Sequence, residues 1–404
     1  MQGVKVIEVA QFTFVPAAGA VLADWGADVI KIEHPERGDT QRGFINLDGM
    51  AVEPNRHILM EHANRGKRSV GIDLSQAEGQ QLLYRLVAEC DVFLTNYLPS
   101  ARRKCKIDYE DIKAHNPTIV YARGSALGDK GPEREQGGFD ATAFWARGGS
   151  SLTVTPEELD GPLQQPGGAY GDSIGGMNIA GGISAALFHR ERTGEGCVLD
   201  VSLLSSGVWA TALTVDMAME HQKATKKPPM PGKDINKNPL IGNFKTADGK
   251  YINLTILTPD KHIRQLFECL GVSELADDSR FSCAAALMEN NIEAHQQIAQ
   301  AFAAQPFKCW IDRLDGVNFQ WAAFQNGLDA SQDRQVLAND MIVEVDAIDG
   351  GRPIRLVANP VQFNGEKVET ERSPQASEHT EMVLMDLGIE WDEIEKLKER
   401  GAIA

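Results

Sequence analysis

The sequence predicts an α/β protein with two domains, a larger one built on a parallel sheet and a smaller one of the α+β type. The chain of 404 residues is too long for one ordinary core, so its length favours two domains. In the first third, short β-branched runs alternate with helical patterns, as in a parallel sheet with covering helices. Residues 223–240, KATKKPPMPGKDINKNPL, are basic, proline-rich and aperiodic, and we place the domain boundary there.

The larger domain opens with alternating strand and helix signals. Strands are expected at 4–9, 29–33, 92–97 and 119–122, and helices at 17–25, 76–89 and 109–115. Gly26 closes the first of these helices, and Asn116-Pro117 ends the last of them before the next strand. A further strand at 197–203 leads into a long apolar helical stretch that runs through 219.

The smaller domain and the tail carry hairpin signals. Asp248-Gly249 lies between two alternating runs, which predicts a tight hairpin, and helices follow from about 260 to 314. The tail has a second hairpin pattern at 341–357 and two helical segments with acidic starts, 378–387 and 391–400. We expect the tail to return to the first lobe, so that the chain divides into 1–223, 224–330 and 331–404.

Composition limits the partners and the compartment. The net charge of -17, from 57 acidic and 40 basic residues, argues against nucleic acid or an anionic membrane as a partner. No stretch reaches the ~20 apolar residues that span a bilayer, and the N-terminal run MQGVKVIEVAQF has no basic or hydrophobic leader pattern. Six widely spaced cysteines without a metal-ligand pattern predict reduced, mostly buried thiols. We therefore expect a cytoplasmic protein.

Several familiar catalytic motifs are absent from the sequence. The first strand-to-helix turn, QFTFVPAAG, lacks the GxGxxG of a nicotinamide site. The chain has no GxxxxGK[ST] for nucleotide phosphates, no HExxH for a catalytic metal and no GxSxG for a serine nucleophile. These absences leave a carboxylate or a histidine to carry the chemistry.

Asp172 is the most informative acid, because it stands in the glycine-rich run GGAYGDSIGGMNIAGG at the expected start of a helix. An Asp at such a place is most often an N-cap that accepts from the first amides. In the functional interpretation, exposed amides and the helix dipole hold the carboxylate ionised, from a reference pKa of ~3.9, and the glycines let a bulky substrate approach. An ionised, accessible carboxylate is a usable nucleophile.

Five segments resemble, in order, the family III CoA-transferases, a family that includes the formyl-CoA, carnitine and bile-acid CoA-transferases. They are VKVIEVAQF, LADWGADVIKIEHPERGD, NRGKRSVGIDL, GDSIGGMNIAGGISAALFHRERTGEG and NPLIGNFKTADGKYI, and the likeness runs over nearly the whole chain. The resemblance implies a Rossmann-like α/β large domain with a small inserted α+β domain. It also implies a homodimer of two interlocked chains and an active site between the domains, with 228–240 near the acceptor acid.

The resemblance assigns the chemistry to Asp172, which would attack the thioester carbonyl of an acyl-CoA. An acyl-aspartyl anhydride and then an aspartyl-CoA thioester would follow, and the acceptor carboxylate would take the CoA through a second anhydride. Backbone amides of the glycine-rich turns would stabilise each oxyanion. The expected ligands are coenzyme A, an acyl-CoA and a carboxylic acid, with no metal and no tightly bound cofactor.

By matching to the family, three turns surround the coenzyme. These residues are Thr13, Phe14, His34, Asn96, Tyr97, Leu98 and Lys104. The family often has Arg where this chain has His34 and Lys104, and Arg37 and Arg103 lie near enough in sequence to substitute. Ile72 to Ser75 match a segment on the adenine side, although the same residues also fit an ordinary strand exit.

The loop from Gln136 through Phe139 to Asp140 matches the family's loop beside the reacting thioester. Asp140 is expected either to orient the acid or substrate beside Asp172 or to cap a helix. The related 2-methylacyl-CoA racemases place an acid/base His immediately before the matching Asp, whereas this chain has Phe139, so racemisation lacks one proton carrier. A non-catalytic CoA-binding protein is the third alternative, and the intact Asp172 argues against it.

Other candidate residues receive structural interpretations. His379 resembles the start of a family helix and is expected to cap or pack the tail. Surface charge is the favoured interpretation of four basic residues at strand and loop ends, whose position only modestly favours a ligand-facing cluster: Arg37, Arg65, Lys67 and Arg68. Five aromatic residues hint at an apolar or aromatic acyl environment, although most aromatics in such segments fill cores: Phe12, Phe14, Phe139, Phe144 and Trp145. The donor and acceptor acids therefore stay open among oxalate, carnitine derivatives, aryl or steroid acids and short dicarboxylates.

Overall fold

The computed structural model describes residues 1–47, 49–230 and 235–404. These residues form two compact units, of which the first comprises 1–154, 162–225 and 334–404, and the second 155–161 and 226–333. The sequence places the boundaries after 223 and 330, within three residues of those in the structure. It does not anticipate that the short segment 155–161 joins the second unit.

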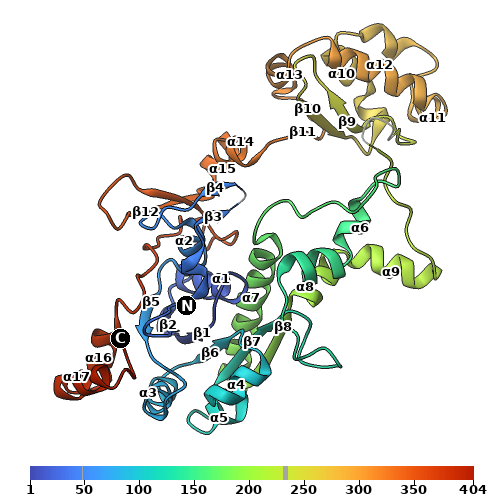
Figure 1. The fold of residues 1–404 in the computed structure, drawn as a ribbon. Coiled ribbons are helices and arrows are strands. Elements are labelled where there is room, and N and C mark those ends of the chain that lie inside the picture. The colour runs from blue at the N-terminus through green and yellow to red at the C-terminus, as the bar shows by residue number, and fades with distance from the viewer. Residues whose placement is uncertain (48, 231–234) are drawn as a thin grey trace. The chain divides into compact units, whose positions relative to one another are not determined.

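A six-stranded parallel sheet forms the centre of the first unit, as the alternating pattern predicts (Figure 1). Its strands, in spatial order, are β5 (Arg68–Gly71), β2 (Asp28–Glu33), β1 (Lys5–Val9), β6 (Val92–Thr95), β7 (Val120–Ser125) and β8 (Cys197–Ser202). The chain crosses from β2 and β5 on one side of β1 to β6 on its other side. In such doubly wound sheets, ligands bind outside the carboxyl ends of the strands at this switch point.

Helices cover both faces of the sheet because its strands are apolar on both sides (Figure 1). Ile7 and Val9 of β1 pack into one core, and Val6 of the same strand packs into the other. The first core contains α3 (Ala77–Ala88), α5 (Tyr109–Lys113), α16 (Thr380–Asp386) and α17 (Trp391–Glu399), and the second contains α1 (Phe14–Asp24) and α7 (Tyr170–Thr193). The sheet is therefore a middle layer.

Helices α1 and α7 approach closely because α7 presents glycines to α1. A Cβ added at Gly175 would lie 2.4 Å from Cε2 of Phe14, and one added at Gly176 would lie 2.8 Å from Cβ of Ala17. In the second turn of α7, the glycines of the run around Asp172 thus allow close packing against α1. This contact fixes the start of α7 beside the turn that opens α1.

The long apolar helical stretch expected after β8 is two helices, α8 (Leu203–Ala210) and α9 (Ala212–His221). The hydroxyl of Thr211 donates to the carbonyl oxygens of Gly148 and Gly207, and this residue is where one helix ends and the next begins. Periodicity could not show the break, because the apolar pattern continues across it.

Shorter elements complete the first unit. They are η1 (Thr40–Gly43), β3 (Asn46–Leu47), β4 (Met50–Ala51), α2 (Ile58–Asn64), α4 (Pro99–Cys105), the π-helix η2 (Ala141–Arg147), α6 (Ser150–Val154), α15 (Arg334–Ala338), β12 (Ile342–Val345) and β13 (Ile354–Val357). The antiparallel pair β12–β13 is the hairpin expected in the tail.

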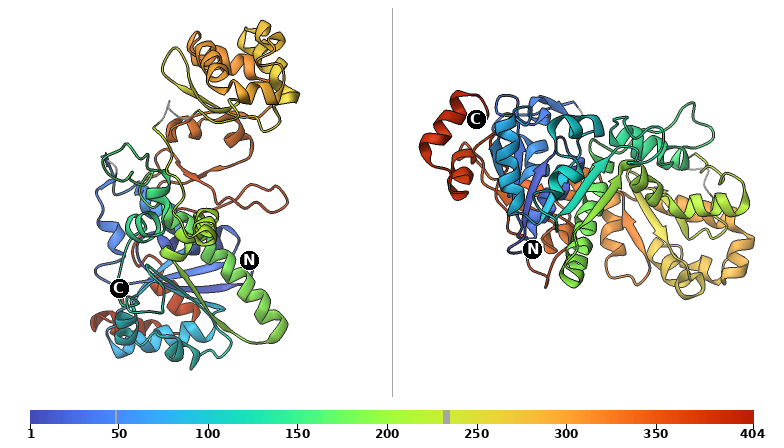
Figure 2. Two further views of the ribbon diagram at one scale, coloured as in Figure 1. Left: turned by 90° about the vertical axis from the view of Figure 1, so that its right-hand side faces the viewer. Right: turned by 90° about the horizontal axis from the view of Figure 1, so that it is seen from below.

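The tail packs against the β5 edge of the sheet (Figures 1 and 2). The amide of His379 donates to the carbonyl oxygen of Ser69, and Nδ1 of His379 accepts from the Ser69 amide at 3.2 Å. The Gly71 amide donates to the hydroxyl of Thr380 at 2.9 Å. His379 therefore has the structural role that the sequence predicts.

The second unit is a small α+β body with its own core. Its antiparallel sheet contains β9 (Ile241–Lys245), β10 (Tyr251–Thr255) and β11 (Trp321–Ala323). The expected hairpin joins β9 and β10 through Gly249, whose φ of +83° suits glycine. The helices are α10 (Pro259–Leu270), η3 (Ser273–Asp277), α11 (Ala284–Glu289), α12 (Asn291–Ala303), α13 (Phe307–Leu314) and α14 (Gly327–Ser331).

Two remaining expectations concern cysteines and membranes. All six cysteines are free thiols, but only Cys90 is buried, Cys283 is exposed and the others are partly buried, so the expectation of mostly buried thiols is wrong. Within the described residues, no helix combines the length and apolarity needed to cross a bilayer.

Candidate active site

A pocket of about 440 Å³ lies at the switch point of the sheet, entirely within the first unit. Its position follows from topology, because Gln11 comes after β1 and Asn96 after β6, the two strands that flank this point. The Gln11 amide donates to Oδ1 of Asn96 at 3.1 Å, and Nδ2 of Asn96 donates to the Gln11 carbonyl oxygen at 2.7 Å. These two hydrogen bonds join the loops after β1 and β6, both of which line the pocket. We call this cavity the switch-point pocket.

The switch-point pocket combines aromatic, glycine and charged groups. It is lined by Gln11, Phe12, Phe14, Asn96, Tyr97, Leu98, Pro99, Ala101, Arg102, Gly124, Ser125, Ala126, Asp129, Arg134, Gly137, Gly138, Phe139, Asp172 and Leu203. Such a mixture of apolar walls and few polar groups is typical of small-molecule sites.

Asp172 lies in the first turn of α7 and opens onto this pocket. The residue at the N-cap is Ala169, with a φ of 60°, so Asp172 is not the N-cap. Within residues 1–47, 49–230 and 235–404, no group donates a hydrogen bond to the Asp172 carboxylate. The capping interpretation is therefore wrong, and the carboxylate oxygens stay available to a ligand.

Asp140 holds the turn that carries Asp172. Its buried carboxylate accepts from the Ala141 amide at 2.8 Å, which caps η2, and from the Gly171 amide at 3.2 Å. Nε2 of Gln165 donates to the same carboxylate at 3.1 Å. Gly171 is required for this approach, because a Cβ there would lie 2.6 Å from Cγ of Phe144. Asp140 thus both caps a helix and orients the first turn of α7.

Burial, and to a smaller extent the neighbouring charge of Asp140, raises the pKa of Asp172 from 3.8 to about 7. The sequence predicts the opposite, because an acid in the first turn of a helix is stabilised by the dipole. That expectation is wrong for a physical reason. Among the described residues no amide points at this carboxylate, so desolvation outweighs the dipole.

The structure brings six of the sequence-predicted site residues into the switch-point pocket. They are Phe14, Asn96, Tyr97, Leu98, Phe139 and Asp172. Four segments separated by up to 158 residues along the chain thus converge on the pocket. They are the first turn, the loop after β6, the loop before η2 and the start of α7. Asp140 joins them from behind, through Gly171.

The remaining predicted ligand contacts lie outside the lining of this pocket. Thr13 is buried and its hydroxyl donates to Oε1 of Gln41 at 2.7 Å. Ile72 is 1% exposed within a core, so its side chain is placed for packing and not for direct contact with a ligand. The others stand partly or fully exposed on the surface: His34, Arg37, Ser75, Lys104 and Gln136.

Sequence reasoning missed several lining residues. Gln11 follows β1 closely, so its place at the carboxyl end of a parallel strand was a usable signal. Its neighbour Phe12, which the sequence offers only as a hint of an aromatic acyl environment, also lines the pocket. Arg102 and Arg134 had no such signal, because each stands in a charged segment that also fits a solvated surface. Residues 231–234, part of the expected acceptor-side linker, lie outside the described residues.

The two arginines of the pocket differ in their partners. Arg102 is buried and pairs with Asp108 and Asp129, both at 3.1 Å. Arg134 is exposed and has no carboxylate within ion-pair distance among the described residues. The guanidinium of Arg134 is therefore available to pair with an anionic ligand. The guanidinium of Arg102 is already paired within the protein and has a structural role.

Comparison with known proteins gives consistent matches over the chain. The family model of CoA-transferase family III matches residues 1–380. The cinnamoyl-CoA:phenyllactate CoA-transferase of Clostridium sporogenes is 31% identical over 398 residues, covering 98% of this chain and 95% of that protein. The (R)-2-hydroxy-4-methylpentanoate CoA-transferase of Clostridioides difficile is 29% identical over 405 residues, covering 100% and 99%.

The fold is also that of solved structures. The crystal structure of a CAIB/BAIF family protein from Brucella suis superposes with a TM-score of 0.79 at 29% sequence identity. The match covers 96% of this chain and 98% of that one.

Proposed function

This chain belongs to CoA-transferase family III, and from that premise we propose that Asp172 is the nucleophile with which it moves CoA from an acyl-CoA to a carboxylic acid. The protein is a CoA-transferase, as its relatives are. What is proposed is the mechanism and the residues that carry it.

In the first half of the proposed cycle, a carboxylate oxygen of Asp172 attacks the thioester carbonyl of the donor. The C–S bond breaks, CoA leaves as a thiolate, and a mixed acyl-aspartyl anhydride remains. The thiolate then attacks the aspartyl carbonyl of this anhydride. The donor acid departs as a carboxylate, and Asp172 carries CoA as a thioester.

The second half repeats these steps in reverse with the acceptor. The acceptor carboxylate attacks the aspartyl-CoA thioester, which releases the CoA thiolate and forms a second anhydride. The thiolate attacks the acyl carbonyl that comes from the acceptor, so that the new acyl-CoA leaves and Asp172 regains its carboxylate. Each bond that forms replaces one that breaks, and no metal or redox cofactor enters the balance.

The single observation that carries the proposal is the state of Asp172. Its carboxylate opens onto the switch-point pocket, accepts no hydrogen bond from any described residue and has a pKa of about 7. A poorly solvated carboxylate of this pKa is a stronger nucleophile than an ordinary aspartate, yet half of it is ionised near neutral pH. Asp140 keeps it in place through the Gly171 amide.

The proposal extends to the coenzyme contacts. Phe14, Asn96, Tyr97, Leu98 and Phe139 line the same pocket as Asp172, which supports contacts near the thioester. The nucleotide end of CoA would extend to predicted residues outside this pocket, which are Thr13, His34, Arg37, Ile72, Ser75, Lys104 and Gln136. Because Ile72 is buried, it offers a ligand mainly its backbone.

Trapping of the covalent intermediates tests the mechanism. The protein is incubated with a panel of acyl-CoAs, quenched with hydroxylamine or borohydride, and its intact mass and modified peptide are measured. We expect a modification on Asp172 that is absent from Asp172→Ala and retained in Asp140→Asn, the neighbouring-carboxylate control. An adduct on another residue, or transfer by Asp172→Ala at the wild-type rate, would contradict the proposal.

The same samples distinguish CoA transfer from the alternative reaction, racemisation at the α-carbon of the acyl-CoA. An enzyme that acts at the α-carbon would exchange the α-proton of its acyl-CoA with deuterated solvent and would need no acceptor acid. Phe139 stands where that chemistry would need a proton carrier. We therefore expect no deuterium in recovered acyl-CoA when the acceptor is omitted.

A further inference from the structure

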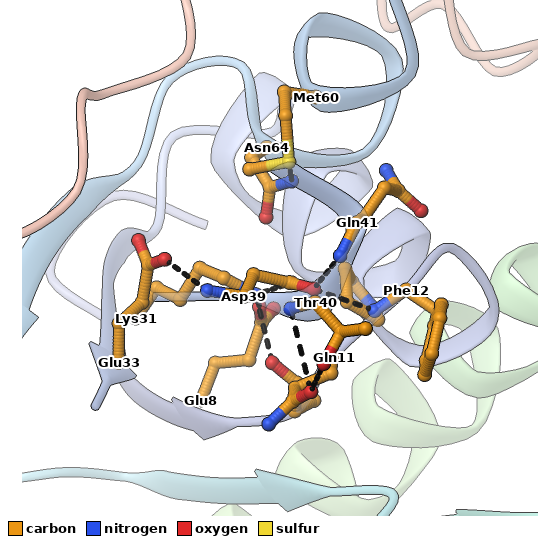
Figure 3. Close-up of polar contacts among 12 residues, drawn as sticks. Glu8, Gln11, Phe12, Lys31, Glu33, Asp39, Thr40, Gln41, Met60 and Asn64 are labelled. Carbon is orange, nitrogen blue, oxygen red and sulfur yellow. Dashed lines mark hydrogen bonds and ion pairs between the residues drawn. The ribbon is translucent and has the colours of Figure 1, made fainter. Parts of the chain in front are cut away.

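Three consecutive residues, of which the last two begin η1, hold three consecutive residues of the turn after β1. Figure 3 shows these three beside Gln11 and Phe12. Oδ1 of Asp39 accepts from the Phe12 amide at 3.1 Å, and the hydroxyl of Thr40 donates to Oε1 of Gln11 at 2.6 Å. Oε1 of Gln41 accepts from the hydroxyl of Thr13 at 2.7 Å. We call Asp39, Thr40 and Gln41 the clasp.

The clasp holds Phe12 in a backbone conformation that a phenylalanine rarely adopts. Phe12 has a φ of 64°, in the left-handed region that disfavours residues with a large Cβ substituent. The bond to Asp39 fixes the amide of that same residue, and Oδ1 also accepts from the Gln41 amide at 2.9 Å. Strain of this kind persists where the surroundings over-determine it, and it is concentrated at functional sites.

Asp39 is itself fixed by a buried charge cluster, defined as Glu8, Lys31, Asp39 and Lys67. Figure 3 shows Lys31 between Asp39 and Glu8. Nζ of Lys31 lies 2.8 Å from Oδ2 of Asp39 and 3.2 Å from Oε1 of Glu8. Nζ of Lys67 lies 2.7 Å from Oε2 of Glu8, and all four side chains are inaccessible to solvent.

The fold makes room for this cluster at the side of α1. A Cβ added at Gly19 would lie 2.0 Å from Oε2 of Glu8 and 2.9 Å from Nζ of Lys67. Burial alone would lower the pKa of Lys31, but the carboxylates of Asp39, Glu8 and Glu33 hold it above its ordinary value. Lys31 thus stays charged and keeps Asp39 in one position. Removing one partner of such a buried ion pair would leave an uncompensated charge in the interior, which is strongly destabilising.

The ring that the clasp positions is part of a wall of aromatic side chains. The Phe12 ring packs edge-on against Phe139, with centroids 5.6 Å apart, and against Phe44, with centroids 6.5 Å apart. Phe139 and Phe44 are 59% and 45% exposed, so this wall has free aromatic surface. Phe12 and Phe139 line the switch-point pocket together with Asp172.

The wall stands beside the reacting carboxylate. Phe139 immediately precedes Asp140, whose carboxylate binds the amide of Gly171, and Gly171 immediately precedes Asp172. Two non-covalent contacts and two peptide bonds thus connect the Phe12 ring to Asp172. The attacked carbonyl must lie at Asp172, and it carries the CoA sulfur on one side and the acyl group on the other. We infer that the acyl group is the part that faces Phe12, while Phe139 lies near the thioester itself.

We propose that Phe12 is a specificity-determining residue that favours aromatic or bulky apolar acyl groups, and that Asp39 and Thr40 are positioning residues that hold its ring at the acyl side of the pocket. The inference rests on the proposed role of Asp172, because that role defines where the acyl group lies. Aromatic surface favours aromatic and apolar ligands by stacking and by area removed from water.

Two thioesters that differ only by a phenyl group test the specificity. 3-Phenylpropanoyl-CoA and propanoyl-CoA are compared as donors, with one acceptor acid that the wild type uses. We expect the wild type to prefer the phenyl donor in kcat/KM, Phe12→Ala to lower that preference about tenfold, and Phe12→Leu to lower it less. An equal loss with both donors would overturn the proposal, because it would place Phe12 against the CoA portion that the donors share.

The positioning residues are tested by the same ratio. The ratio of the two kcat/KM values does not depend on the fraction of active protein, so mere destabilisation leaves it unchanged. We expect Asp39→Asn and Thr40→Val to lower the ratio in the same direction as Phe12→Ala. Thr40 is exposed, so Thr40→Val remains informative if the Asp39 variant fails to fold. Unchanged ratios in every soluble variant would contradict a positioning role.

Binding separates this inference from the proposed mechanism. The dissociation constants of both thioesters are measured by calorimetry on Asp172→Asn, with and without Phe12→Ala. A phenyl preference that Phe12→Ala abolishes supports the inference, even if trapping finds no adduct on Asp172. A protein that forms the adduct but binds both thioesters equally would retain the mechanism and lose the inference.

Discussion

At the scale of single residues, the behaviour of Asp172 follows from what surrounds its carboxylate. An acid in the first turn of a helix would ordinarily be favoured in its charged form. Here burial and the charge of Asp140 raise its pKa to about 7. The environment therefore gives one carboxylate a basicity suited to nucleophilic attack near neutral pH, while the hydrogen-bonded Asp140 orients the turn.

The first prediction concerns the pH dependence of acylation. The raised pKa means that Asp172 is protonated below about 7, so kcat/KM for the donor should rise about tenfold per pH unit in the acid range and level off above that value. Asp140→Asn should move the midpoint to lower pH, although not to 3.8, because burial is the larger cause of the shift. Stopped-flow release of CoA measures both profiles, and a rate that is flat down to pH 5 would contradict the assignment.

At the scale of elements, the glycines of α7 have two different environments. Those in its second turn meet Phe14 and α1, whereas Gly181, farther along the same helix, has nothing within 4 Å of an added Cβ. Because all of these positions are glycines of one run, the sequence does not show which of them pack against α1. The first set lets α7, which carries Asp172, approach the pocket-lining Phe14, and Gly181 only weakens the helix.

The second prediction compares these glycines. Gly175→Ala should destabilise the protein by about 1–3 kcal/mol, because its Cβ would lie 2.4 Å from the Phe14 ring, and it should slow acylation by displacing that ring. Gly181→Ala is the matched control and should stabilise the helix by up to ~1 kcal/mol. Urea denaturation measures both, and shifts of the same sign would show that the contact between α7 and Phe14 does not govern stability.

At the scale of the whole molecule, the outer surface of the first unit carries exposed apolar side chains on three neighbouring helices, α7, α8 and α9. They are Phe188, Trp209, Leu213, Met217 and Met219, and their exposed fractions range from 51% to 78%. Large exposed apolar groups commonly mark protein contacts. We propose that this surface takes part in the homodimer that the family resemblance implies.

The third prediction is an oligomeric state. Sedimentation equilibrium should give twice the chain mass of 44.1 kDa for the wild type. Trp209→Glu should shift the mass toward that of one chain, because it places a charge in the contact. Ile292→Glu, at an exposed apolar position of the second unit, is the control and should leave the mass unchanged. A wild type that sediments as one chain would exclude the homodimer.

The order of strands in the whole sheet also determines where the switch-point pocket lies. The parallel order of the sheet brings the ends of β1 and β6 together, and the switch-point pocket lies there. The clasp adds a loop that follows β2. Residues of four distant segments thus meet because strand order, not distance along the chain, sets which loops are neighbours.

The sequence by itself determined most of the elements of this protein. Alternating patterns predicted β1, β2, β6, β7 and β8, and turn residues predicted the β9–β10 hairpin, because strand periodicity and turn chemistry are local properties. The glycine-rich run and the family resemblance singled out Asp172. β5 was indicated only by the strand exit at Ile72 to Ser75, since RSVG is too short for a pattern of its own. The break at Thr211 was missed, since its cause is a bond to the distant Gly148.

Only the tertiary structure decided the electrostatic state and the surroundings of the site. The pKa of Asp172 depends on burial and on Asp140, 32 residues earlier in the chain, which no local pattern reveals. The conformation of Phe12 depends on Asp39, and the position of Asp39 depends on the buried Lys31, eight residues earlier, which no sequence pattern singles out. Local preference fixes where strands and helices form, whereas desolvation and ion pairing depend on which distant groups the fold brings together.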